Sequence, residues 1–137
     1  MAIFYADASA LVKLLKEEAE SPFLRAFLAD ATLVSSELIL TEIPRAVHRA
    51  VAQDPRLSLD LLLALAGELI DALALRPADR DLLAAAGALA EPALRALDAI
   101  HIASAVGLSP IGAFVTYDER QAAAARLAGL RTAAPGA

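Results

Sequence analysis

The chain has 137 residues, no cysteine, 58% hydrophobic residues and a formal net charge of −5 at pH 7. This length suffices for one domain with a substantial core, and the absence of cysteine excludes disulfide bonds, thiolate metal sites and cysteine nucleophiles. Because the chain is acidic and shows neither a secretory signal nor an apolar run of about 18 residues, we expect a cytoplasmic protein, not a nucleic-acid coat protein or a membrane protein.

The chain is predicted to open as a strand, a turn and a helix. Residues 2–6 are apolar and aromatic, which indicates a short strand ending at Asp7. Ser9 has the position of a helix cap, and a helix is expected from there to about Glu20. A second helix is expected over residues 21–29, because a capping serine followed by proline is a typical helix start. An acidic residue therefore stands directly after the first strand.

The next strand is predicted at residues 31–36 and is followed by a helical pattern that runs to about residue 53. Pro44 lies inside that pattern, although an interior proline costs about 3 kcal/mol. If Thr41 caps a fresh helix, Pro44 falls in its first turn, where the missing N–H is no loss. Glu42 would then lie at the N-terminus of this helix.

The middle of the chain is predicted to be mostly helical. Residues 58–71 form a strongly apolar helix with Ser58 as its cap, residues 72–77 a weak strand, and residues 78–90 a further helix. The helix over residues 58–71 offers more apolar surface than a small sheet can cover. Part of that surface is therefore expected to be an interface.

The last third is predicted to alternate in the same way. A helix over residues 93–107 precedes a strand at residues 111–117, and Asp118 stands at the end of that strand. A helix over residues 118–129, with a glycine at its C-terminus, leads to a last short strand at residues 130–134.

Asp98, in the middle of an apolar helix, needs a partner. It shares a helical face with Leu94 and Ile102, which would otherwise point to a core. Since an unpaired buried charge is costly, Asp98 must meet a basic group, take up a proton, bind a metal or lie at the rim of a cleft. Arg95 and His101, one helical turn away on either side, are the local, purely structural alternative.

Strands that alternate with helices predict a parallel sheet covered on both sides, with reactive groups at the carboxyl ends of its strands. Two carboxylates about 5 Å apart repel by roughly 3 kcal/mol at an effective dielectric of about 20, so an acidic cluster there needs protons or cations. With two histidines and no cysteine, the chain is expected to bind an ion that prefers oxygen, Mg²⁺ or Mn²⁺, and such ions commonly serve phosphoryl chemistry. The acids predicted to cluster are Asp7, Glu42, Asp98 and Asp118.

Four stretches of sequence follow one another along the chain: FYADASALVKLLKEEAES, TEIPRAV, LRALDAIHIASA and FVTYDER. In this order they resemble the motifs of PIN-domain ribonucleases, most closely the VapC-type toxins of bacterial toxin–antitoxin pairs. The resemblance spans nearly the whole chain and includes all four clustered acids. It implies a single PIN domain over residues 1–137, of the α/β class, with a central parallel sheet of four to five short strands and helices on both faces.

The resemblance further implies an endoribonuclease that uses Mg²⁺ or Mn²⁺ to activate water against an RNA phosphodiester bond. It assigns metal binding and catalysis to the four acids and a supporting role to two hydroxyl groups. The acids are Asp7, Glu42, Asp98 and Asp118, with Asp7 and Asp98 as principal ligands, and the hydroxyls are those of Ser9 and Thr116. The implied partners are RNA, a VapB-like antitoxin that blocks the cleft, and a second copy in a homodimer.

Three basic or titratable side chains each have two interpretations. Arg45 and Arg49 follow Glu42 on the same helical face, where they either meet RNA phosphates or are ordinary solvated charges. His101 either approaches the cleft or is a packed residue of an apolar helix, which is the more common role of a lone histidine.

Two other functions compete with the ribonuclease. A phosphatase of the haloacid-dehalogenase type also has an aspartate after its first strand, but it needs a second aspartate at the position of Ser9. A PIN-like module that only binds a protein partner is the remaining alternative. Failure of the purified protein to bind a divalent metal would support that alternative.

Overall fold

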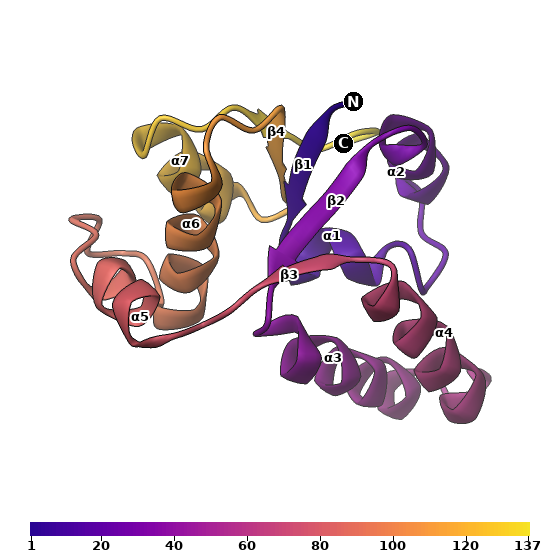
Figure 1. Ribbon diagram of the computed structural model, residues 1–137. Coiled ribbons are helices and arrows are strands. Elements are labelled where there is room, and N and C mark those ends of the chain that lie inside the picture. The colour runs from indigo at the N-terminus through magenta and orange to yellow at the C-terminus, as the bar shows by residue number, and fades with distance from the viewer.

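The computed structural model describes all 137 residues, and its centre is a five-stranded, fully parallel sheet (Figure 1). The strand order is β3-β2-β1-β4-β5, so the first strand in the chain is the central one. Each strand is short, and the neighbouring strands β1 and β4 consist only of apolar and aromatic residues. The strands are β1 (Ile3–Ala6), β2 (Thr32–Ser36), β3 (Ala74–Arg76), β4 (Ala113–Val115) and β5 (Thr132–Ala133).

Helices cover both faces of this sheet (Figure 1). They are α1 (Ala8–Val12), α2 (Ser21–Leu28), α3 (Ile39–Gln53), α4 (Leu59–Asp71), α5 (Arg80–Gly87), α6 (Ala96–Leu108) and α7 (Glu119–Leu127). None of them combines the length and the apolar composition needed to cross a membrane. The predicted α/β class, with a five-stranded parallel sheet between two layers of helices, is confirmed.

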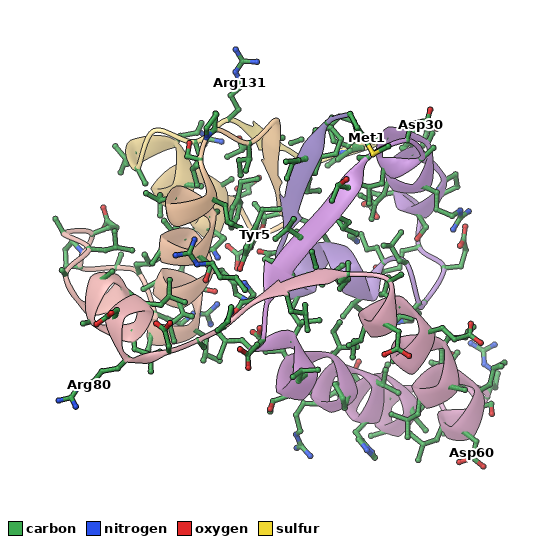
Figure 2. All side chains as sticks on the ribbon, viewed as in Figure 1. Met1, Tyr5, Asp30, Asp60, Arg80 and Arg131 are labelled. Carbon is green, nitrogen blue, oxygen red and sulfur yellow. The ribbon has the colours of Figure 1, made fainter.

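Alternate side chains of the strands divide the core in two. On one face Tyr5 and Phe114 stack with ring centroids 5.3 Å apart and pack under α6 and α7. On the other face Ala6 and Val115 pack under α1, α2, α3 and α4. Charged side chains such as Arg80 extend from the periphery into solvent (Figure 2). This alternation is what a strand period of two residues produces in a sheet buried on both faces.

The expected helix to Glu20 is wrong, because α1 ends at Val12. The segment after it folds back on itself: Lys13 forms ion pairs of 3.0 Å with both Glu18 and Glu20. The Ser21 hydroxyl also donates to the Lys13 carbonyl at 2.7 Å, so Ser21 is not the side-chain cap expected for α2. These contacts between residues far apart in the segment outweigh its local helical pattern.

The helical pattern predicted to run to about residue 53 is one helix, and the alternative that Thr41 caps a fresh helix is wrong, because α3 begins at Ile39 and runs through Pro44. Ile39 and Ile43 are fully buried, and their packing favours one continuous helix. Pro44 removes the N–H that would bond to the Leu40 carbonyl, and Leu40 is about half exposed. The helix therefore tolerates its proline on a side that water can reach.

The remaining helices lie where they were predicted, with shifted ends. The Ser58 hydroxyl caps α4 as expected by accepting from the Leu61 N–H at 3.2 Å. The helices α5 and α7 begin later than predicted because Asp79 and Asp118 cap them with their side chains. The helix α6 begins only at Ala96, since the residues before it form turns. Asp98 consequently lies in the first turn of α6, not in its middle.

Gly129 ends α7 with a φ of +91°, a conformation that costs an L-residue about 1–2 kcal/mol. Replacing it by alanine should lower the free energy of unfolding by about 1 kcal/mol through backbone strain alone, because a Cβ there meets no atom within 4 Å. Gly67, inside α4 and equally unobstructed, is the matched control, and Gly67→Ala should stabilise by about 0.5–1 kcal/mol. Urea unfolding measures both, and equal changes in the two variants would contradict this assignment.

Candidate active site

Two of the predicted acids follow neighbouring strands at the carboxyl edge of the sheet. Asp7 comes directly after β1, and Asp118 comes just after β4. The register pairs Ala6 with Val115, and the Asp7 N–H donates to the Val115 carbonyl at 3.2 Å. The sheet topology therefore brings these residues together across most of the chain length, as predicted.

The carboxylate of Asp7 is buried, with a relative exposure of 5%. Its Oδ1 accepts from the Ser9 hydroxyl at 2.6 Å and from the Ala10 N–H at 3.2 Å, and its Oδ2 accepts from the Thr116 hydroxyl at 2.6 Å. Burial raises the pKa of Asp7, and the bonds from the two hydroxyls partly offset that rise. Asp7 also caps α1, the role expected of Ser9, because its extended backbone at the strand end aims the carboxylate at the first helical turn.

Ser9 and Thr116 also organise the loop after β4. The Ser9 hydroxyl accepts from the Tyr117 N–H at 3.0 Å, and the Thr116 hydroxyl accepts from the Asp118 N–H at 3.1 Å. Both hydroxyls thus use their proton on Asp7 and their lone pairs on the backbone. The structure places both of them beside Asp7.

Asp98 forms an ion pair with Arg95, three residues before it, as their spacing suggested. The Arg95 Nε lies 3.1 Å from Asp98 Oδ2, and a second nitrogen of the same guanidinium lies 3.7 Å from Asp118 Oδ2. The Arg95 side chain is 71% exposed, so the pairs contribute at most about 1 kcal/mol. Arg95 therefore bridges two acids that would otherwise repel each other, in a position from which it is easily displaced.

The Glu42 carboxylate is hydrogen-bonded to His101. Its Oε1 lies 2.6 Å from His101 Nε2, and His101 Nδ1 lies 2.8 Å from the Tyr5 hydroxyl. His101 is buried, as a packed residue would be, yet both ring nitrogens have partners. The pairing of Glu42 with His101 was missed, and no local pattern in the sequence indicates it.

A second missed residue is Gln121 of α7, which is 1% exposed. Its side-chain nitrogen lies 3.3 Å from the Asp98 carbonyl, and its backbone N–H donates to Asp118 Oδ1 at 3.1 Å. Its side-chain oxygen is buried without a hydrogen-bond partner. Gln121 thus connects the starts of α6 and α7. It lies in an alanine-rich helix, and no pattern in the sequence around it predicts this contact.

All four acids line one open cleft of about 600 Å³. Cationic side chains on the same walls face them, and Arg45 and Arg49 are exposed there and form no ion pair. As the side chains stand, no three acidic or histidine groups lie close enough together to hold one metal ion. Binding an ion would therefore require carboxylates of the cleft wall to rotate. The cations of the cleft are Lys16, Arg45, Arg49 and Arg95.

Comparison with known proteins places the sequence among relatives of similar length. The family model described as PIN domain matches residues 4–127. Ribonuclease VapC35 of Mycobacterium tuberculosis is 38% identical over 141 residues, which covers 98% of each chain. Ribonuclease VapC46 of the same organism is 36% identical over 143 residues, and Ribonuclease VapC47 is 35% identical over 143 residues. These alignments cover 98% of this chain and 99% and 98% of the respective relatives.

The buried carboxylate makes metal-free stability depend on pH. Because the pKa of Asp7 is raised on folding, its contribution is fully present below the ordinary carboxyl pKa of about 4 and is lost as pH rises through the raised value. Asp7→Asn should therefore raise the melting temperature in EDTA at pH 7 by roughly 3–6 °C, a gain on the order of 1 kcal/mol, and change it little near pH 3.5.

Asp54→Asn is the matched control for this experiment. The bond from Arg56 lowers the pKa of Asp54, so this substitution should give no gain at pH 7. Thermal scans from pH 3 to pH 8 make the comparison. A melting temperature for Asp7→Asn below that of the wild type at pH 7 would show that the Asp7 carboxylate stabilises the metal-free fold.

Proposed function

The chain belongs to the PIN-domain family and, within it, to the VapC ribonucleases, and from this premise we propose that it is a metal-dependent endoribonuclease, the toxin of a toxin–antitoxin pair. The single observation that carries the proposal is the convergence of four acids, from two strand ends and two helices, on one open cleft. We propose further that residues 1–137 act as one PIN domain.

The donor set of the cleft fits Mg²⁺ or Mn²⁺. Its acids offer only oxygen, which these ions prefer, and the buried carboxylate of Asp7 has hydroxyl donors but no ion pair. Arg95 already occupies a cation's place between Asp98 and Asp118. These features support metal binding by the acids of the cleft. The proposed ligands are Asp7, Glu42, Asp98 and Asp118.

A bound divalent ion supplies positive charge at the phosphodiester and lowers the pKa of water, so that water can attack. Neighbouring hydroxyl and backbone N–H groups hold the carboxylates of the cleft in position for this chemistry. Ser9 and Thr116 fix both oxygens of Asp7, and the N-terminal turn of α7 fixes Asp118 through two backbone N–H groups. The Ser9 hydroxyl is committed to Asp7, which supports a positioning role for it and not that of a nucleophile.

Arg45 and Arg49 are proposed to bind the RNA backbone. They lie one turn apart on α3, both line the cleft, and both are exposed without an acidic partner. In a chain with a net charge of −5, unpaired cations beside the acidic site are the groups able to attract a polyanion to it. We interpret them as phosphate contacts and not as ordinary solvated charges.

The proposed partners follow from the family and from the apolar surface. Ribonuclease VapC proteins are the relatives, and we infer that this chain has a VapB-like antitoxin and forms a homodimer in the cytoplasm. Leu61 and Leu65 of α4 are exposed, as the excess of apolar surface on this helix predicted. A non-catalytic binding module remains the alternative function, and the retention of all four acids in the cleft favours the enzyme.

The first test is cleavage of total cellular RNA with Mg²⁺ or Mn²⁺, with and without EDTA, by mapping new 5′ ends. Wild type should make discrete cuts that EDTA abolishes, and Asp98→Asn should reduce their rate by about 100-fold or more, because it removes a charged ligand. Asp60→Asn, which changes an exposed aspartate of α4 that does not line the cleft, should cut like wild type. Cuts that persist in EDTA or in Asp98→Asn would refute the proposed mechanism.

A second test addresses RNA binding. Arg45→Ala and Arg49→Ala should each raise KM for a cleaved RNA by roughly threefold to tenfold at unchanged kcat. Each should also reduce the slope of log affinity against log salt by about 1, since one phosphate contact is lost. Arg80→Ala, an exposed arginine at the start of α5, is the control (Figure 2). If the salt slope of the cleft variants matches that of Arg80→Ala, both arginines are solvated charges.

A further inference from the structure

A continuous hydrogen-bonded chain crosses the core from the sheet to the cleft. It starts at the Tyr5 hydroxyl on β1, passes through both ring nitrogens of His101 on α6, and ends at the Glu42 carboxylate on α3. The two bonds are 2.8 and 2.6 Å long. Tyr5 lies near the middle of the molecule (Figure 2) and is fully buried, and His101 is 2% exposed. Three separate elements therefore contribute one polar group each to this chain.

The donors and acceptors of this chain match throughout. A carboxylate only accepts hydrogen bonds, so the N–H of His101 Nε2 donates to Glu42. With Nε2 protonated, Nδ1 is the acceptor of the neutral imidazole, so the Tyr5 hydroxyl donates to it at 2.8 Å. The Tyr5 and His101 rings also meet edge to face with centroids 5.8 Å apart. The imidazole is thus held by packing and at both of its nitrogens.

His101 is the only hydrogen-bond partner of the Glu42 carboxylate. Two other acids of the cleft are fixed differently, Asp7 by hydroxyls and Asp118 by backbone N–H groups. Glutamate has a long, flexible side chain, and repulsion from neighbouring carboxylates would drive an unrestrained one toward solvent. The bond to His101 opposes both effects.

We propose that His101 is a positioning residue that holds the Glu42 carboxylate ready to ligate the metal ion, with the Tyr5 hydroxyl fixing the imidazole. This inference rests on the metal-binding function proposed above. It assigns to a buried histidine the function that outer partners commonly have in metal sites, where removing one lowers metal affinity or activity about 10–100-fold. His101 acts on the metal only through Glu42.

The competing interpretation is that His101 is merely a satisfied core residue. Its removal would then disturb the protein in the same way whether or not Glu42 is present. A double-mutant cycle separates the two interpretations, because coupling between residues in one network makes their effects non-additive.

The experiment measures Mn²⁺ affinity of the metal-free protein by titration calorimetry. His101→Met, which fills similar space without a donor, should weaken binding by about tenfold in the wild-type background and by less than about twofold in Glu42→Ala. His101→Gln, which can return a donor to Glu42, should recover most of the loss. Equal losses in both backgrounds, or a His101→Gln variant as weak as His101→Met, would overturn the inference.

Ile100→Val is the matched control, since Ile100 is a buried residue of the same helix whose side chain packs in a separate cluster with Leu82 and Ala86 of α5. It should leave Mn²⁺ affinity unchanged. If His101→Met does not fold, Tyr5→Phe takes its place in the cycle, because it removes one hydroxyl from the chain and keeps the ring. It should weaken Mn²⁺ binding by roughly threefold, and again only when Glu42 is present.

Asp98→Asn, measured in parallel, distinguishes failure of this inference from failure of the proposed function. One result would overturn only the inference: wild type binds Mn²⁺ tightly, Asp98→Asn weakens this binding, and His101→Met weakens it equally with and without Glu42. Absence of Mn²⁺ binding by wild type would overturn the proposed function and the inference together.

Discussion

The buried carboxylate of Asp7 is the constraint on which the arrangement of the site depends. A charge out of reach of water needs donors, and Asp7 receives one from Ser9 in its own helical turn and one from Thr116 at the end of β4. The second donor exists only because β1 and β4 are neighbours in the register that pairs Ala6 with Val115. A shift of one residue would turn Thr116 to the other face of the sheet and leave an oxygen of Asp7 without its partner. The hydrogen bonding of Asp7 therefore depends on the topology and register of the sheet.

Most of the fold could be predicted because its signals are local. Short apolar runs bounded by turn residues indicate all five strands, and the rule that parallel strands present their carboxyl ends at one edge predicts that Asp7 lies near Asp118. The helix predicted to run to Glu20 and the helix start considered at Thr41 were wrong for the opposite reason. Burial of Ile39 and Ile43, and the pairing of Lys13 with Glu18 and Glu20, are tertiary effects that no local pattern contains.

In the site, too, contacts with local signals could be predicted and contacts that depend on tertiary packing could not. Asp98 offered two interpretations, an ion pair with Arg95 or a place in an acidic cleft, and the structure realises both, because the residue lies in the first turn of its helix at the rim of the cleft. The pair of Glu42 and His101 could not be predicted, since it joins residues 59 positions apart and depends on how α3 and α6 approach each other. Gln121 was missed on the same grounds.

The groups that hold Asp7 and Glu42 differ in mobility from the group that pairs with Asp98 and Asp118. Asp7 and Glu42 are held by the hydroxyls of Ser9 and Thr116 and by the His101 imidazole, of which Thr116 and His101 are buried and Ser9 is partly buried. At the outer end, Asp98 and Asp118 share a guanidinium that is mostly exposed and only weakly bound. In the proposed function, a cation would meet the Asp7 and Glu42 carboxylates already held in position, and the carboxylates at the rim would rotate toward it as it displaced the Arg95 guanidinium. Such an arrangement confines the cost of reorganisation to the part of the site that water can reach, where it is smallest.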